Sequence, residues 1–217
     1  MMDKIFLLLF LISLMSCNNY YKGLDVSVYQ RDIDWNKIKQ NFDFAIIRMG
    51  FGKNGVDKYW DINYANAKAA GVPIGTYLFS YANNEADSAE EAQNALSLLN
   101  GKQFEWPIFY DIEGDAANSK VNEKFKTFCD ILSKANYLCG LYSGASRLNS
   151  KYNDDIKDNY PIWVAHWGVE QPKYSKQWGI WQYTSKGKVD GIKGNVDLDY
   201  AQIYYPDMIM SQHLNGY

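Results

Sequence analysis

The segment Trp106-Pro107-Ile108-Phe109-Tyr110-Asp111-Ile112-Glu113 joins a run of apolar and aromatic residues to two carboxylates, and a glycine then ends the pattern. Such a run is typical of a buried β-strand. Side chains two residues apart in a strand point to the same face and lie roughly 6.5–7 Å apart. We therefore expect Asp111 and Glu113 side by side at the carboxyl end of this strand.

Two carboxylates at the end of an apolar strand need a physical explanation, because burying an unpaired charge is unfavourable. Catalysis is one explanation. Two close carboxylates do not both ionise freely, so the pKa of one rises and that group can donate a proton near neutral pH. A salt bridge to an arginine, or a strand that simply ends in solvent, would account for the same pair without catalysis.

The composition suits one globular domain with a full core, since 47% of the 217 residues are hydrophobic and the net charge is −3. The sequence has no long basic run, so nucleic acid is not an expected partner. Aromatic residues make up 16% of the chain. Many of them must fill the core, and any exposed rings would suit flat ligands such as sugars.

The first residues form a separate segment. Lys4 precedes an apolar run, Ile5 to Leu14, that is too short to span a bilayer and is typical of a secretory signal peptide. Leu14-Met15-Ser16-Cys17 resembles a bacterial lipobox, although Met at its second position departs from the commonest form. We expect residues 1–16 to be removed and Cys17 to carry a lipid that anchors the exported protein to the membrane of the cell envelope. Ordinary cleavage, giving a soluble secreted protein, is the alternative.

The remaining chain is expected to contain a short linker, residues 17–22, and one domain, residues 23–217. Two further cysteines, Cys129 and Cys139, lie on an expected helix and on the strand that follows it. Export permits a disulfide, but this placement favours two buried free thiols. No Cys/His spacing indicates zinc, and no metal or cofactor is expected.

Apolar runs of strand type alternate with segments of helical type. Strands are expected at 21–27, 44–50, 72–79, 106–113, 137–143, 161–167, 178–183 and 196–199, and helices at 34–39, 63–70, 85–99, 121–135 and 147–156. This alternation predicts an α/β fold with a parallel sheet. Eight strands allow a closed barrel, and the lack of helices between the last strands explains how it could fit a short chain. An open sheet of five or six strands is the alternative.

The acidic residues fall at strand ends, which is where α/β barrels place their active sites. Asp25 ends the first expected strand, and Asp197 lies on the eighth. In a closed barrel these strands are neighbours, so both acids would join Asp111 and Glu113 at one mouth. Other expected strand ends carry candidate substrate-binding aromatic residues, namely Tyr77, Tyr142, Trp163 and Trp181. A helix cap or a loop position would also explain Asp25 or Asp197.

Carboxylates without a Cys/His cluster are compatible with three kinds of site: a divalent cation site, a site of glycoside cleavage, or a site that binds carbohydrate without catalysis. Aromatic residues around the mouth favour sugar over metal. His166 lies between Ala165 and Trp167 and is interpreted as a packing residue, not as a general base.

An ordered set of short motifs identifies the chain more closely. It comprises GLDVS at 23–27, IDW at 33–35, FAIIR at 44–48, GVPIG at 71–75, YDIE at 110–113, WVA at 163–165, WQY at 181–183 and VDLD at 196–199. The set resembles the glycoside hydrolase family 25 lysozymes, the Chalaropsis-type N-acetylmuramidases, from residue 22 to about 204. The resemblance implies an irregular TIM-like barrel of about five β/α units followed by strands without helices. It also implies hydrolysis of the β-1,4 bond between N-acetylmuramic acid and N-acetylglucosamine in peptidoglycan glycan strands.

The same resemblance assigns roles to the acids. Glu113 matches the family's general acid/base, and Asp111 matches the acid that orients the substrate's 2-acetamido group for attack on the anomeric carbon. Asp25 and Asp197 match two further acids of the site, with Asp199 as the alternative to Asp197. The sequence departs from the family at Tyr77-Leu78-Phe79, where a Tyr-His-Phe type is frequent, and we expect this to tune binding only.

We therefore expect a monomeric peptidoglycan hydrolase. A glycosidase acting on chitin or another acetamido sugar, and an inactive module that only binds wall glycans, are the alternatives.

Overall fold

The computed structural model describes residues 20–217. The expected signal peptide and the first half of the linker, residues 17–19 with Cys17, lie outside the described residues. Within residues 20–217, no helix combines the length and the apolar character needed to cross a membrane.

Eight strands close into a barrel, as the sequence predicts, and the open-sheet alternative is wrong. They are β1 (Tyr21–Val26), β2 (Phe44–Phe51), β4 (Ile74–Phe79), β5 (Ile108–Asp111), β6 (Cys139–Gly144), β7 (Ile162–Ala165), β8 (Ile180–Gly187) and β9 (Val196–Ala201). Their order is β1-β9-β8-β7-β6-β5-β4-β2, and pairing of β1 with β2 closes the barrel. The short strand β3 (Gly55–Val56), which the sequence analysis missed, forms a hairpin with the end of β2.

One strand runs against the others. All neighbours from β1 through β2 and β4 round to β8 are parallel, whereas β9 is antiparallel to both β8 and β1. The first residues of β9 therefore lie at the barrel end where the other strands finish. This reversal brings Asp197, near the start of β9, to the mouth.

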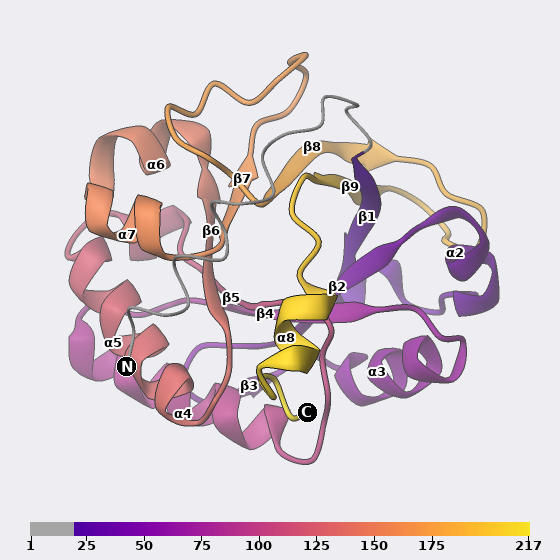
Figure 1. Ribbon diagram of the computed structural model, residues 1–217, viewed down its shortest axis with the longest axis horizontal. Coiled ribbons are helices and arrows are strands. Elements are labelled where there is room, and N and C mark those ends of the chain that lie inside the picture. Colours follow the sequence, from indigo (N-terminus) through magenta and orange to yellow (C-terminus); the bar gives the residue numbers. More distant parts are fainter. Residues whose placement is uncertain (1–19) are drawn as a thin grey trace.

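Helices cover the barrel on both sides of the view in Figure 1. The helices are α2 (Trp35–Asn41), α3 (Trp60–Ala69), α4 (Glu85–Leu99), α5 (Val121–Lys134), α6 (Ala145–Lys151), α7 (Asp154–Asn159) and α8 (Pro206–Ser211). Helices α2 to α7 connect strands up to β7, the connections from β7 to β8 and from β8 to β9 contain no helix, and α8 follows β9. This is the predicted barrel of about five β/α units followed by bare strands. The helix expected at 147–156 is two helices, because Asn153 starts α7 by capping it.

The end of the barrel opposite the mouth is closed by large side chains. Phe44 at the start of β2 stacks on Trp106, with ring centroids 3.9 Å apart. Tyr205 and Ile209, from the C-terminal segment around α8, are buried in the same cluster. The helix α8 is not among those expected from the sequence. Because the end of the barrel opposite the mouth is filled, any ligand must enter from the mouth.

The cysteine prediction is wrong. Cys129 of α5 and Cys139 of β6 form a disulfide, with their Cα atoms 5.4 Å apart. Cys129 is on the buried face of α5, and a tight turn with Asn136 at φ +62° leads the chain straight back into β6. The two residues therefore meet although they belong to different elements.

Candidate active site

A cavity of about 280 Å³ opens at the carboxyl ends of the parallel strands. It is lined by Asp25, Ser27, Tyr29, Gln30, Arg48, Tyr77, Phe79, Tyr81, Asp111, Glu113, Tyr142, Trp163, Gln182 and Asp197. All four predicted catalytic acids are in this set. The structure thus brings together carboxylates that are up to 172 positions apart in the chain.

Asp111 and Glu113 enter the cavity from one strand end. Asp111 is the last residue of β5 and is 3% exposed, whereas Glu113 follows it by two positions and is half-buried. Gly114 adopts φ +55°, which glycine tolerates, and turns the chain into the 3₁₀ helix η3 (Gly114–Ala117). This turn leaves Glu113 at the rim of the cavity, close to the place where a substrate must enter.

Asp25 and Asp197 come from neighbouring strands. They are register partners in the antiparallel pairing of β1 with β9, and Asp25 accepts a hydrogen bond of 2.7 Å from Gln182 Nε2. Asp199 also lies on β9 but is outside the lining, 1% exposed, and accepts a hydrogen bond of 2.8 Å from Trp163 Nε1. Of the two candidates on β9, Asp197 therefore reaches the cavity and Asp199 lies buried behind it.

Burial shifts the acids toward their protonated forms. Desolvation raises the pKa of Glu113, and Arg147 opposes part of this rise. Desolvation, followed by the nearby charge of Glu113, raises the pKa of Asp111 well above its usual value. The same two causes raise the pKa of Asp197 to about 6. Desolvation and the charges of Asp199 and Asp197 raise the pKa of Asp25 strongly. The site therefore holds protons at mildly acidic pH, as an acid catalyst requires.

The structure places three of the four predicted aromatic residues at the cavity. Tyr77, Tyr142 and Trp163 line the cavity, and the ring of Trp163 lies edge-on to both tyrosines. Trp181 does not line it: its side chain is 5% exposed and packs against Trp178. Side chains alternate along β8, so Gln182 points into the barrel and Trp181 points away from it.

Gln182 is the most informative residue that the sequence analysis missed. Its Oε1 accepts hydrogen bonds of 2.9 Å from both Tyr142 Oη and Trp167 Nε1, while its Nε2 donates to Asp25. One amide side chain thus fixes two aromatic residues and one acid. The alternation of side chains along a strand, counted from Trp181, was the sequence signal that could have identified Gln182.

Arg48 is the only Lys or Arg side chain in the cavity lining of the described chain. Its Nε donates to Asp57 Oδ2 at 2.7 Å, and its guanidinium lies 5.5 Å from the ring centroid of Tyr29. Its charge lowers the pKa of Asp111, against the larger effect of burial. A charged residue within the apolar run of β2 was a signal that the sequence analysis left unused.

Several known proteins are similar to this chain. An autolytic lysozyme of Clostridium acetobutylicum is 28% identical over 181 residues, which is 82% of this chain and 55% of that protein. Lysozyme M1 of Streptomyces globisporus is 29% identical in an alignment of 202 positions that covers 81% of this chain and 66% of that protein. The matched part of the chain thus spans little more than half of the first relative's length.

Solved structures show the same fold. The bacterial lysozyme from Streptomyces coelicolor aligns with a TM-score of 0.75 and 26% identity, covering 92% of this chain and 97% of that one. The modular autolysin LytC from Streptococcus pneumoniae, solved with a synthetic peptidoglycan ligand, gives 0.72 and 28%, covering 86% and 47%. The family model described as glycosyl hydrolases family 25 matches residues 24–192, well over half of the chain. The chain therefore belongs to glycosyl hydrolase family 25.

Proposed function

We propose that this protein is a lysozyme that hydrolyses the β-1,4 bond between N-acetylmuramic acid and N-acetylglucosamine in peptidoglycan. The observation that carries the proposal is the position of Asp111 and Glu113, two residues apart at one strand end and facing one cavity. Family membership and the lysozymes among the relatives support it.

Glu113 is proposed as the general acid and base. It is half-buried, its pKa is raised by desolvation, and its side chain makes no capping hydrogen bond to the helix that follows it. The carboxyl group is therefore free to give its proton to the leaving glycosidic oxygen. It would then accept a proton from the water that completes hydrolysis.

Asp111 is proposed to hold the 2-acetamido group of the substrate. Its Oδ1 is buried and has no hydrogen-bond partner within residues 20–217, an unfavourable state that an amide N–H donor would relieve. With its N–H held there, the acetamido carbonyl oxygen attacks the anomeric carbon while the bond to the leaving oxygen breaks. The attack is intramolecular, which gives it a large effective concentration.

The spacing of the two acids favours this route over direct displacement by water. An inverting pair stands on opposite sides of the sugar with room for a water molecule between them. Asp111 and Glu113 instead lie on the same face of one strand end, so both approach the sugar from one side. A neighbouring acetamido group supplies the nucleophile that this arrangement lacks.

We propose that the enzyme acts on peptidoglycan outside the cytoplasm, carried there by the expected signal peptide and tethered by a lipid on Cys17. The similarity to an autolytic lysozyme and to an autolysin solved with a peptidoglycan ligand supports a wall substrate.

Product analysis tests the proposed bond. Purified peptidoglycan is digested, the new reducing ends are reduced with borohydride, and the products are identified by mass spectrometry. Muramitol at the new ends is the expected result. Glucosaminitol ends, or activity on chitin oligomers but not on peptidoglycan, would contradict the proposal.

A further inference from the structure

A tryptophan outside the catalytic cavity presents an unusual amount of surface to solvent. Trp167 follows the end of β7 by two residues and is 53% exposed. It is not among the residues that line the cavity, whereas Trp163 on the same strand is buried there. An exposed aromatic side chain is not unusual by itself, but Trp167 is also bonded to the wall of the substrate cavity.

The ring of Trp167 is held in place by the cavity wall. Its Nε1 donates a hydrogen bond of 2.9 Å to Gln182 Oε1. Gln182 lines the cavity and donates to Asp25, one of the four acids. The indole N–H is therefore hydrogen-bonded within the protein, and the exposed part of the side chain is its apolar ring surface.

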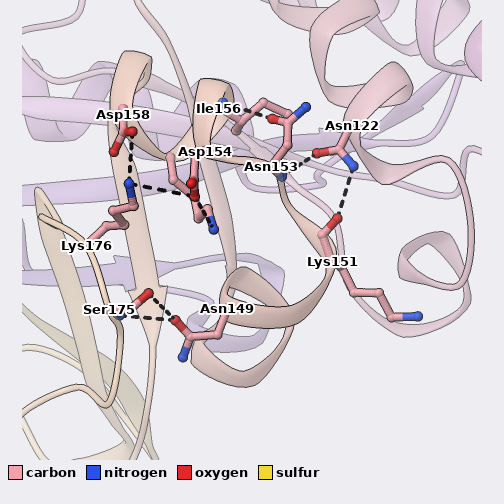
Figure 2. Close-up of polar contacts among 10 residues, drawn as sticks. Asn122, Asn149, Lys151, Asn153, Asp154, Ile156, Asp158, Ser175 and Lys176 are labelled. Carbon is pink, nitrogen blue, oxygen red and sulfur yellow. Dashed lines mark hydrogen bonds and ion pairs between the residues drawn. The ribbon is translucent and has the colours of Figure 1, made fainter.

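The connection after Trp167 is fixed to the helices beside it. In the middle of this connection, the backbone N–H of Lys173 donates to His166 Nδ1 at 3.0 Å. Figure 2 shows Asn149 of α6 accepting hydrogen bonds from the backbone and side chain of Ser175, and Lys176 pairing with Asp158 of α7. These anchors limit the movement of the segment and favour one orientation of Trp167 before a ligand arrives.

We propose that Trp167 is a stacking platform for a sugar ring of the glycan strand, forming a subsite outside the catalytic cavity. The inference rests on the proposed function, because it assumes that a glycan strand occupies the cavity. A pyranose presents C–H groups on one face, and an aromatic ring buries that face without needing further hydrogen bonds. Because the platform is preorganised, stacking loses little conformational entropy.

The surroundings of Trp167 fit a sugar better than a protein partner. Gly168 and Glu170 are exposed and leave the indole as a single apolar surface, far smaller than a specific protein interface requires. On another part of the mouth, Tyr29 and Tyr81 line the cavity and are 78% and 62% exposed. A glycan strand that crosses the mouth of the barrel would thus meet aromatic rings both at the cavity and beyond it.

The test compares Trp167→Ala and Trp167→Phe with the wild type on defined peptidoglycan oligosaccharides of four and eight sugars. For the longer substrate, Trp167→Ala should raise KM about tenfold, equivalent to about 1.4 kcal/mol, with kcat changed less than about twofold. The effect on the shorter substrate should be smaller. Trp167→Phe keeps a ring but loses the indole N–H, and it should retain most of the affinity. Ile62→Ala, which removes an exposed apolar residue from α3, is the matched control and should change neither constant.

A binding experiment separates this inference from the proposed function. Calorimetric titration of the eight-sugar ligand into Glu113→Gln, with and without Trp167→Ala, measures the subsite without turnover. Weaker binding of the double variant supports the platform even if the wild type proves not to cleave peptidoglycan. Equal KM and equal binding with and without the Trp167 ring would overturn the inference. So would a loss of kcat that is the same for Trp167→Phe and Trp167→Ala, because that result would assign Trp167 to the positioning of Gln182.

Discussion

Asp25 and Asp197 lie directly opposite each other where β1 and β9 pair in antiparallel register. Desolvation is the largest cause of the raised pKa of both acids: the pKa of Asp25 is well above its usual value, with a further contribution from the charge of Asp197, and the pKa of Asp197 is about 6. Like charges facing each other across two strands are unfavourable. Ionisation of these two acids therefore lowers the stability of the fold.

Replacement of Asp197 by Asn should stabilise the fold at neutral pH. A carboxyl group whose pKa is higher in the folded than in the unfolded chain contributes stability below the unfolded pKa, and this is lost as the pH rises to about 6. The Asn variant does not ionise and avoids that loss. After discounting for partial exposure, we expect a gain of about 1–2 kcal/mol at pH 7.5.

Urea denaturation at pH 7.5 and pH 4 measures this effect. The gain should be absent at pH 4, where the wild-type carboxyl is protonated in the folded state. An equal gain at both pH values would show that the charge of Asp197 is not its cause.

Arg147 should set the alkaline limit of activity. Its positive charge lowers the pKa of Glu113, in opposition to burial. Arg147→Met removes that charge, so Glu113 should stay protonated to higher pH and the alkaline limb of kcat/KM should move upward. Lys151→Met, an exposed change on the same helix, is the control and should leave the limb in place. A downward shift for Arg147→Met would contradict the assignment of Glu113 as the acid.

Lys124 should be essential for stability although it lies outside the cavity. Its side chain is 1% exposed, and its Nζ donates to the backbone carbonyls of Ala82 and Ala116, in the segments that follow β4 and Glu113. Lys124→Met would leave both buried carbonyls without this donor, and we expect a loss of about 2–3 kcal/mol in the free energy of unfolding.

Lys126→Met provides a matched control on the same helix. Lys126 pairs with Asp155 at the surface, with 44% of its side chain exposed, so its removal should cost less than about 1 kcal/mol. Thermal denaturation of the two variants compares them directly. Similar stability would show that the Lys124 contacts contribute little.

The strands and acids were predictable because their signals are local. Continuous apolar runs such as the one ending at Asp111 mark buried strands, and the two-residue spacing to Glu113 fixes a shared face. The meeting of Asp25 with Asp197 followed from barrel closure. What the sequence did not indicate was that β9 runs antiparallel, which is the reason Asp197 at the start of that strand reaches the mouth.

The errors concern side-chain direction and long-range contacts. Trp181 was assigned to the cavity by its position near a strand end, but the phase of the alternation along β8 places Gln182 there instead. The phase depends on the register with neighbouring strands, which a single sequence does not fix. The placement of Cys129 and Cys139 on different elements favours free thiols, but the turn that returns α5 onto β6 brings them together in a disulfide.

The central claim, that Glu113 is the proton donor and acceptor of a glycoside hydrolase, is tested most directly by Glu113→Gln. Gln is similar in size to Glu but cannot deliver the proton, so release of reducing ends from purified peptidoglycan should fall at least about 1,000-fold, within the range for loss of a general acid. The fold should survive, because Glu113 is half-buried and makes no helix-capping hydrogen bond, and circular dichroism checks this. A folded Glu113→Gln variant that releases reducing ends at the wild-type rate would contradict the account.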